Sequence, residues 1–305
     1  MAAADLQLVG LAVTIGAILV VGAITSPHFL TSGNMLNVGR QVSIVALLGL
    51  AVTIGLITRV IDFSVGAVLA LTAVLVALTA DGPMLATIAL LLAVIAAVSL
   101  VKGVLLAYLG LGSLITTLGV ALVIDGIARG VSNSRLVPVS SQDWRFLGSG
   151  DIAGFPASVL TVAAVFILAA FLMHSTVWGK YIYAAGANPL AARIAGVPVR
   201  RVKLAALTIS TLIAALAGVL FVGRVAGGDP NVGTAMSFDA LVVAVLGGAS
   251  LRGGRGSVLG VVLAAVLIGL MFNLFTLLNL PTYWQMIARG CIIVGAISLD
   301  AVRRS

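Results

Sequence analysis

Long apolar runs, each close to the length needed to cross a bilayer, follow one another along almost the whole chain. A spanning helix needs about 20 mostly apolar residues, because each residue adds only about 1.5 Å along the axis. Such runs cover residues 6–25, 41–57, 64–80, 84–107, 114–131, 158–174, 204–225, 256–278 and 283–299. Only 9% of the 305 residues are charged, against about 25% in soluble domains. The pattern predicts an all-α, polytopic integral membrane protein forming a single transmembrane domain, residues 1–305.

A shorter apolar run, 235–247, decides the predicted topology. The loop 175–203 is basic and belongs in the cytoplasm under the positive-inside rule. If 235–247 also crosses the membrane, the Gly/Arg loop 248–256 and the tail with Arg303 and Arg304 fall on the same side. We therefore expect about ten transmembrane helices, one of them short, with both termini cytoplasmic.

Within the basic loop, the residues from Asn188 onward predict a short helix. Asn188 can cap free backbone amides, Pro189 suits the first helical position, and Gly196 is a stop signal. The apolar residues expected on one face are Leu190, Ile194 and Val197. Arg193 is left on the polar face. Such a helix is either a docking surface for a soluble partner or a basic helix that rests on anionic membrane lipid.

The sequence contains no constellation for catalysis or for metal binding. It has no Glu and no G-x-x-x-x-G-K-[ST] pattern, so ATP would have to be bound by another subunit. His28 and His174 lack a second ligand at metal spacing. Asp125 and Arg129, four residues apart in an apolar run, predict an ion pair. The net charge of +8 resides in loops between spans, and it indicates topology rather than nucleic-acid binding.

The most specific motifs lie in five segments. They are YIYAAGANPLAARIAGVPVRRVK, LIAALAGVLFVGRVAGGDPNVGTAMSFDALVVAVLGGASLRGGRGSVLG, NMLNVGRQVSIVALLGLAVTIGLIT, IDFSVGAVLAL and LLAYLGLGSLITTLG. Together they resemble the permease subunits of ribose-type sugar ATP-binding cassette (ABC) importers, in the family that also includes branched-chain amino acid permeases. The resemblance covers about residues 29–300 in the family's order.

The resemblance implies a multi-pass subunit of the bacterial cytoplasmic (inner) membrane that is not itself an enzyme. It would form the pathway for a monosaccharide or a related small polar solute. The implied partners are ABC ATPase subunits that hold ATP and Mg²⁺, an external solute-binding protein, and a second copy of the chain or a paralogous permease. No cofactor is expected on this chain.

The resemblance implies the coupling segment, and the polarity of spans and external loops adds candidates for two further roles. The residues expected to couple to the ATPase are Asn188, Pro189, Arg193, Gly196, Arg200, Arg201, Arg252 and Arg255. The candidates for the translocation pathway are Asp62, Ser64, Gly66, Asp239 and Asn273. The candidates for docking the binding protein, from the external loop 132–157 and a second external loop at 227–236, are Arg135, Asp143, Arg145 and Asp229.

Three positions depart from the family pattern. They are Arg59-Val60 in place of the usual Gly-Gly, Lys102-Gly103 in place of Asn-Gly, and Phe272-Asn273 in place of paired Asn. Bulky or charged residues at these positions favour a substrate other than ribose or one half of a heterodimeric pore, and the sequence leaves both open. The other interpretations are an ABC permease for a branched-chain amino acid, an ion-coupled secondary transporter, and a membrane enzyme acting on lipid-linked substrates.

Overall fold

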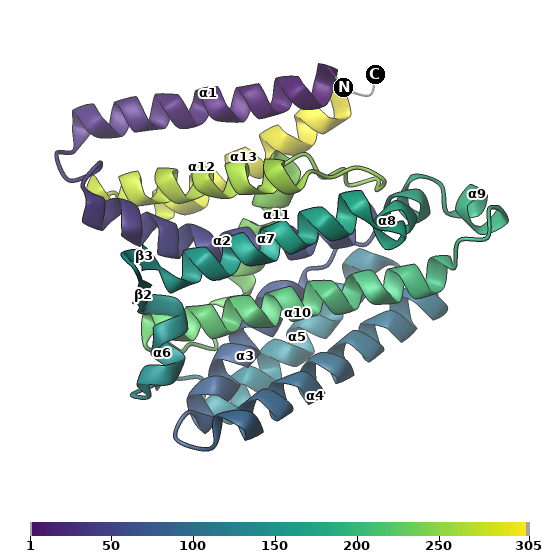
Figure 1. Ribbon diagram of the computed structural model, residues 1–305, viewed down its shortest axis with the longest axis horizontal. Coiled ribbons are helices and arrows are strands. Elements are labelled where there is room, and N and C mark those ends of the chain that lie inside the picture. The colour runs from purple at the N-terminus through teal and green to yellow at the C-terminus, as the bar shows by residue number, and fades with distance from the viewer. Residues whose placement is uncertain (1, 303–305) are drawn as a thin grey trace.

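The structure, a computed structural model, describes residues 2–302 and consists almost entirely of helices (Figure 1). The α-helices are α1 (Ala2–Thr25), α2 (Ser32–Ile57), α3 (Ser64–Thr79), α4 (Met84–Gly103), α5 (Ser113–Ser132), α6 (Gln142–Ser149), α7 (Ala157–Ser175), α8 (Val177–Ala187), α9 (Pro189–Ile194), α10 (Val199–Val225), α11 (Gly233–Leu246), α12 (Val258–Leu277) and α13 (Thr282–Val302). A π-helix, η1 (Val104–Tyr108), continues α4. The strands are β1 (Val137–Pro138), β2 (Asp151–Ile152), β3 (Phe155–Pro156) and β4 (Gly227–Gly228). The predicted all-α fold class is confirmed.

Seven helices in the described part of the chain are long and apolar enough to cross a membrane. They are α1, α2, α4 with η1, α5, α7, α10 and α12. The helices α3 and α11 are apolar but shorter, with 16 and 14 residues. The chain is thus a polytopic membrane protein, while the count of about ten crossings and the cytoplasmic termini stay predictions. Arg303 and Arg304, which entered the topology argument, lie outside the described residues.

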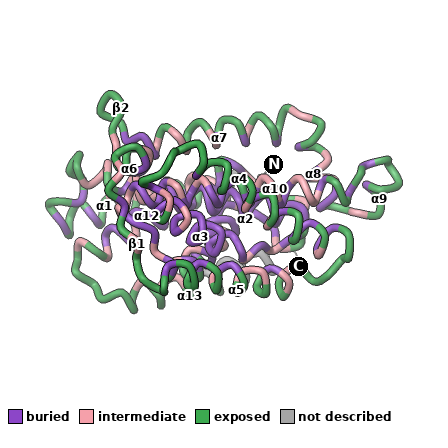
Figure 2. Tube along the Cα trace, turned by 90° about the horizontal axis from the view of Figure 1, so that it is seen from below, coloured by how far each residue is buried: buried purple, intermediate pink, exposed green. Residues whose placement is uncertain are grey.

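The helices form a central group and a peripheral group. Of the most apolar 18-residue stretch of α2, 83% is buried inside the protein, against 11% of the corresponding stretch of α1. The main core joins α2 to α3, α10, α11 and α12, and Figure 2 shows these helices buried while large parts of the outer helices are exposed. The outer helices expose rows of Leu, Ile and Val. Because such rows have no place in water, they form the surface that contacts lipid.

The two ends of the bundle are built differently (Figure 1). We call them the α6 end, with α6 and the four strands, and the α9 end, with α8, α9 and the loop between α11 and α12. At the α6 end, β1 pairs antiparallel with β4, and β2 with β3. Trp144 of α6 is buried. A Cβ on Gly148 would come within 2.2 Å of the Leu220 carbonyl oxygen, so α6 lies in direct backbone contact with α10.

Candidate functional site

The basic segment predicted to dock a partner folds as α8, α9 and the start of α10. Asn188 caps α9, because its Oδ1 accepts hydrogen bonds from the backbone N–H groups of Leu190 and Ala191 at 3.1 and 3.0 Å. Pro189 occupies the first helical turn. Gly196 follows the helix with a φ of 82°, in the left-handed region that favours glycine. The predicted cap, start and stop of this helix are confirmed.

The apolar side chains of α9 are largely uncovered. Leu190 is 67% exposed and Ile194 is 81% exposed, whereas Ala192 and Val197 are buried against the protein. The prediction that Val197 shares the face of Leu190 and Ile194 is wrong, because the helix ends at Ile194 and the chain turns at Gly196. Figure 1 shows α9 projecting from the body of the molecule. An apolar face of two residues is therefore available to a partner.

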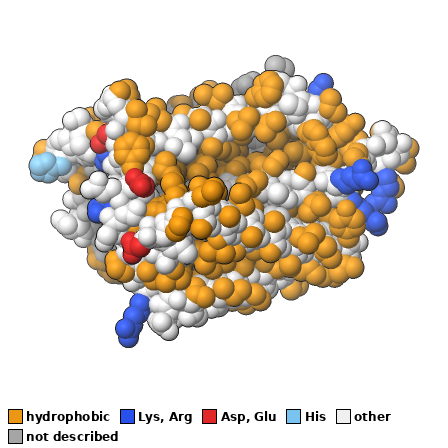
Figure 3. All heavy atoms as spheres, turned by 60° about the horizontal axis from the view of Figure 1, so that its bottom comes forward, with side chains coloured by type: hydrophobic (Ala, Val, Ile, Leu, Met, Phe, Trp, Pro, Cys, Tyr) orange, Lys and Arg blue, Asp and Glu red, His pale blue; other side chains and the backbone are white. Residues whose placement is uncertain are grey.

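Basic side chains accompany this exposed face. Arg193, Arg200 and Arg201 are all exposed. Figure 3 shows Lys and Arg side chains gathered at the α9 end, and in this view the acidic side chains lie toward the opposite end. The Arg200 guanidinium also lies 6.0 Å from the ring centroid of Tyr108 in η1. The α9 end thus presents two apolar side chains among positive charges.

The Gly/Arg loop 248–256 lies against this segment, because a Cβ on Gly254 would come within 2.7 Å of Ala187 Cα at the end of α8. The N–H group of Gly254 donates a hydrogen bond to the carbonyl oxygen of Ile57, at the end of α2, at 2.8 Å. Arg252 and Arg255 are exposed. The structure therefore brings the two loops predicted to couple to the ATPase to the same end of the molecule.

Two side chains tie α8 to its neighbours. The Tyr183 hydroxyl donates to the Gly256 carbonyl oxygen at 3.0 Å, and burial raises the pKa of Tyr183, which keeps the phenol protonated as a donor. Arg59 Nε donates to the Gly186 carbonyl oxygen at 2.6 Å, and its Nη2 donates to the Ala187 carbonyl oxygen at 2.7 Å. These two carbonyls end α8, so the guanidinium fills the place where a helix accepts a cation.

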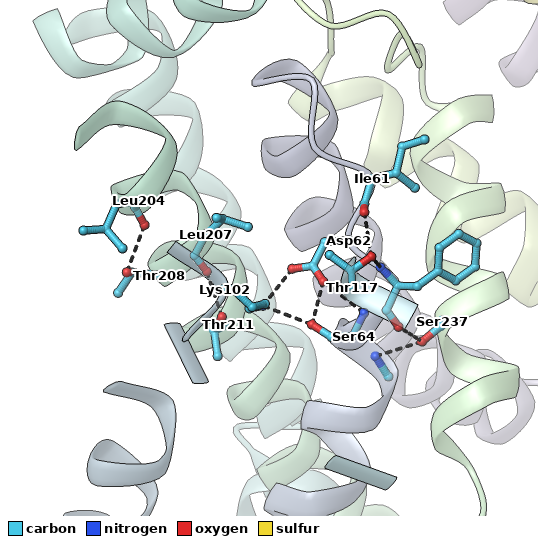
Figure 4. A network of polar contacts seen from close by, with 12 residues as sticks. Ile61, Asp62, Ser64, Lys102, Thr117, Leu204, Leu207, Thr208, Thr211 and Ser237 are labelled. Carbon is cyan, nitrogen blue, oxygen red and sulfur yellow. Dashed lines mark hydrogen bonds and ion pairs between the residues drawn. The ribbon is translucent and has the colours of Figure 1, made fainter. Parts of the chain in front are cut away.

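A buried ion pair follows directly along the chain from Arg59. Lys102 Nζ donates to Asp62 Oδ2 at 2.8 Å and to Ser64 Oγ at 3.1 Å, while Ser64 Oγ donates to Asp62 Oδ1 at 2.6 Å (Figure 4). Lys102 is 0% and Asp62 is 2% exposed. Charged groups this deep need both a counter-charge and hydrogen bonds. The pair joins the end of α4 to the connection between α2 and α3.

Hydrogen bonds from α5 and α11 complete the network of Figure 4. Thr117 accepts from the N–H of Phe63 at 3.2 Å, and Ser237 donates to the Phe63 carbonyl oxygen at 2.7 Å. The N–H of Gly66 donates to Ser237 Oγ at 3.1 Å. A Cβ on Gly66 would lie 2.0 Å from a backbone oxygen of α11, so only glycine fits. Three pathway candidates, Asp62, Ser64 and Gly66, thus meet at one packed junction.

The other two pathway candidates belong to separate pairs. Asp239 of α11 forms an ion pair with Arg289 of α13, and Arg289 Nη2 donates to Asp239 Oδ2 at 3.0 Å. Asn273 of α12 exchanges two hydrogen bonds with Asn34 of α2, each at 2.9 Å. Both side chains are satisfied by contacts between helices.

The candidates for docking a binding protein lie together at the α6 end. Arg135, Asp143 and Arg145 are exposed, and Asp229 Oδ1 accepts from the N–H of Asn231 at 2.9 Å. The pairing of β1 with β4 joins the two loops that supply these residues.

The predicted ion pair between Asp125 and Arg129 is wrong. It is not among the ion pairs of the described residues. Arg129 Nη1 instead donates to Asn231 Oδ1 at 2.6 Å. Asp125 lies against Gly233, the first residue of α11, where the helix dipole favours a negative charge.

Sequence reasoning missed two residues, Arg59 and Lys102. In the sequence both stand out as departures from a family pattern of small residues. Opposite charges at Lys102 and Asp62, each at the end of an apolar run, were the available signal for the buried pair. Among the described residues, no group of three His, Cys, Asp or Glu side chains could hold a metal ion.

A bundle of lipid-facing helices with a capped basic segment at one end defines a polytopic membrane protein. Residues 34–297 match the family described as "Branched-chain amino acid transport system / permease component", and the chain belongs to this family.

Several proteins similar to this chain are permeases named for particular sugars. Ribose import permease protein RbsC of Escherichia coli is 34% identical over 251 residues, which cover 80% of this chain and 78% of that protein. The ribose import permease protein of Haemophilus influenzae is 31% identical over 246 residues, covering 79% and 76%. The L-arabinose ABC transporter permease protein AraH of Azospirillum brasilense is 35% identical over 209 residues, covering 68% and 62%. No solved structure matches the chain.

Proposed function

We propose that the chain is the membrane-spanning permease of an ABC importer for a monosaccharide or a related small polar solute. The similarity to permeases named for ribose and arabinose, over most of the chain, supports a sugar as cargo. An external binding protein would deliver the sugar, and separate ATPase subunits would bind ATP and Mg²⁺. The family description also names branched-chain amino acids, which is the alternative cargo to be tested.

The proposal rests on the exposed apolar face of α9. This helix is capped at its start by two hydrogen bonds, yet it leaves Leu190 and Ile194 uncovered beside exposed arginines. Lipid alone would not require a capped helix that projects from the bundle, whereas an ATPase groove of matching shape would. The loop 248–256, with Arg252 and Arg255, would complete the contact.

In this proposal the α9 end faces the cytoplasm and the α6 end faces outward. The chain crosses the bilayer about ten times, with α3, α11 and α13 completing the count and both termini inside. The α6 end, with Asp143 and Arg145 exposed, receives the loaded binding protein. A second permease, identical or related, completes the pathway in the bacterial inner membrane. Movement of α9 would then rearrange the junction at Asp62, Ser64 and Gly66.

Co-purification of the tagged chain from its native membrane tests the proposal. Mass spectrometry should find an ABC ATPase and an external binding protein, and a second permease sequence would identify a heterodimer. Thermal-shift screening of the binding protein then decides between sugars and branched-chain amino acids. A chain that purifies alone, and that transports solute on an ion gradient without ATP, would contradict the proposal.

One substitution makes the test specific for α9. Ile194→Asp places a charge on the uncovered face and should abolish co-purification of the ATPase without changing the melting temperature of the permease. Ile152→Asp is the matched control, because Ile152 is also exposed but lies in β2 at the α6 end. It should leave the ATPase bound.

A further inference from the structure

Arg59 occupies an unusual place in the backbone. It follows α2 with a φ of 64°, in the left-handed region that a side chain other than glycine enters at a cost of about 1–3 kcal/mol. A glycine would avoid this cost. The arginine is compensated by two short hydrogen bonds to the Gly186 and Ala187 carbonyl oxygens. The strained conformation therefore serves to hold the end of α8.

The contact with α8 fixes the position of α9. Ala187 is followed at once by Asn188, the cap of α9, so there is no flexible linker between the guanidinium and the helix. On the other side of Arg59, the Ile57 carbonyl oxygen accepts the N–H of Gly254. A displacement of α9 must therefore move the segment that begins at Arg59.

This segment leads within three residues to the buried ion pair. Val60, next to Arg59, forms a small buried cluster with Leu106 of η1 and Leu207 of α10. Asp62 then binds Lys102, the residue just before Gly103 and η1. The segment is held on both sides, by apolar packing and by charge.

A second contact links η1 to the residues that follow α9. Arg200, beyond α9 in the first turn of α10, lies over Tyr108 at the end of η1. Short π-helices inside α-helices are frequently found at functional sites. Both ends of α9 thus act on η1, one through Arg59 and the Asp62–Lys102 pair, the other through Arg200.

We propose that Arg59 is a positioning residue that transmits movement of α9 to the Asp62–Lys102 pair and η1, and thereby couples ATP hydrolysis to opening of the pathway. This inference rests on the proposed function, in which α9 contacts the ATPase. It assigns Arg59 a role in the ratio of transport to hydrolysis, and not in assembly of the complex.

The decisive variant is Arg59→Gly in the complete complex of permeases, ATPase and binding protein, reconstituted in liposomes. Glycine tolerates the left-handed conformation, so folding and ATPase attachment should be preserved. It cannot bind the carbonyls that end α8. We expect the amount of solute transported per ATP hydrolysed to fall by about threefold or more. Arg59→Lys, which keeps the charge but not the two-nitrogen contact, should give an intermediate ratio.

The matched control is Asn279→Gly. Asn279 also follows a helix in the left-handed region, with a φ of 52°, but it lies after α12 at the opposite end. Its replacement should leave the transport-to-hydrolysis ratio unchanged. A ratio equal to wild type in Arg59→Gly, or in Arg59→Lys if the glycine variant does not assemble, overturns the inference while leaving the proposed function intact. A wild-type complex that transports no solute with ATP overturns the proposed function itself.

Discussion

Both ends of the bundle contain close backbone contacts, but at the α9 end long charged side chains also reach across to other segments. At the α6 end, Gly148 touches the backbone of α10 and Trp144 is buried beneath α6. At the α9 end, Gly186 of α8 likewise lies against the backbone of Ile57, and Arg59 and Lys102 add connections through their side chains. Backbone contacts have little freedom to rearrange, but hydrogen bonds of long side chains can stretch or exchange partners. The added side-chain contacts at the α9 end suit a segment that responds to a partner, whereas the α6 end suits a fixed surface.

The largest effect should come from breaking the buried pair that supports the α9 end. Lys102→Met leaves Asp62 buried without a counter-charge, which should lower the free energy of unfolding by about 3–5 kcal/mol. Unfolding of the purified chain in mixed detergent micelles measures it. The double variant Asp62→Leu/Lys102→Met should recover most of the loss, because no charge is left unpaired.

An exposed ion pair provides the control for this prediction. Arg40 and Asp151 lie 2.7 Å apart at the α6 end with partly exposed side chains. Arg40→Gln should cost less than about 1 kcal/mol, since water replaces the lost contact. If Lys102→Met costs no more than Arg40→Gln, the charged contacts at the α9 end do not carry the stability inferred for them.

A smaller loss of stability should follow from a substitution that pushes α6 away from α10. Gly148→Val places methyl groups where Leu220 already lies, and the strain should cost about 1–3 kcal/mol. We expect stimulation of ATP hydrolysis by the binding protein to be lost while the ATPase stays attached. Stimulated and basal hydrolysis rates of the reconstituted complex measure this. Ser149→Val, at the exposed neighbouring position, should leave stimulation unchanged; equal losses in both variants would contradict a rigid α6 surface.

The smallest effect, on the local stability of α9 and on ATPase binding, should come from removing the cap of α9. Asn188→Ala removes the oxygen that caps two backbone amides, which should cost about 1 kcal/mol of local helix stability and weaken ATPase binding about fivefold. Titration of the permease with purified ATPase measures it. Thr161→Ala removes a hydroxyl that bonds the Ala157 carbonyl oxygen near the start of α7, away from α9, and should not affect ATPase binding. Equal weakening in both variants would show that α9 has no special part in the contact.

Features that depend on neighbouring residues along the chain could be predicted from sequence. Seven of the nine long apolar runs match helices of the described chain that are long and apolar enough to cross a membrane. Asn188, Pro189 and Gly196 predicted the limits of α9, because capping and helix termination are local. The gathering of basic residues at one end also follows from their placement in loops.

Contacts between distant segments could not be predicted in the same way. The sequence prediction paired Asp125 with Arg129, the nearest opposite charge. In the fold, Arg129 instead binds Asn231 and Asp125 lies against Gly233, both near the start of α11. Likewise Lys102 lies 40 positions from Asp62, and nothing in the spacing indicates that α4 would meet the α2–α3 connection. Side-chain pairing across a bundle depends on which helices are neighbours, and apolar periodicity does not specify this.

The separation of Asp62 from Lys102 also has a consequence for biosynthesis. Asp62 emerges from the ribosome 40 residues before its partner, directly ahead of α3, which has only 16 residues. An uncompensated charge costs about 2.5–3.5 kcal/mol at the centre of a spanning segment and less toward its end, where Asp62 lies. The cost falls once α4 arrives with Lys102. The α3 and α4 helices should therefore enter the bilayer as a pair, and the ion pair sets the order in which this part of the membrane domain is assembled.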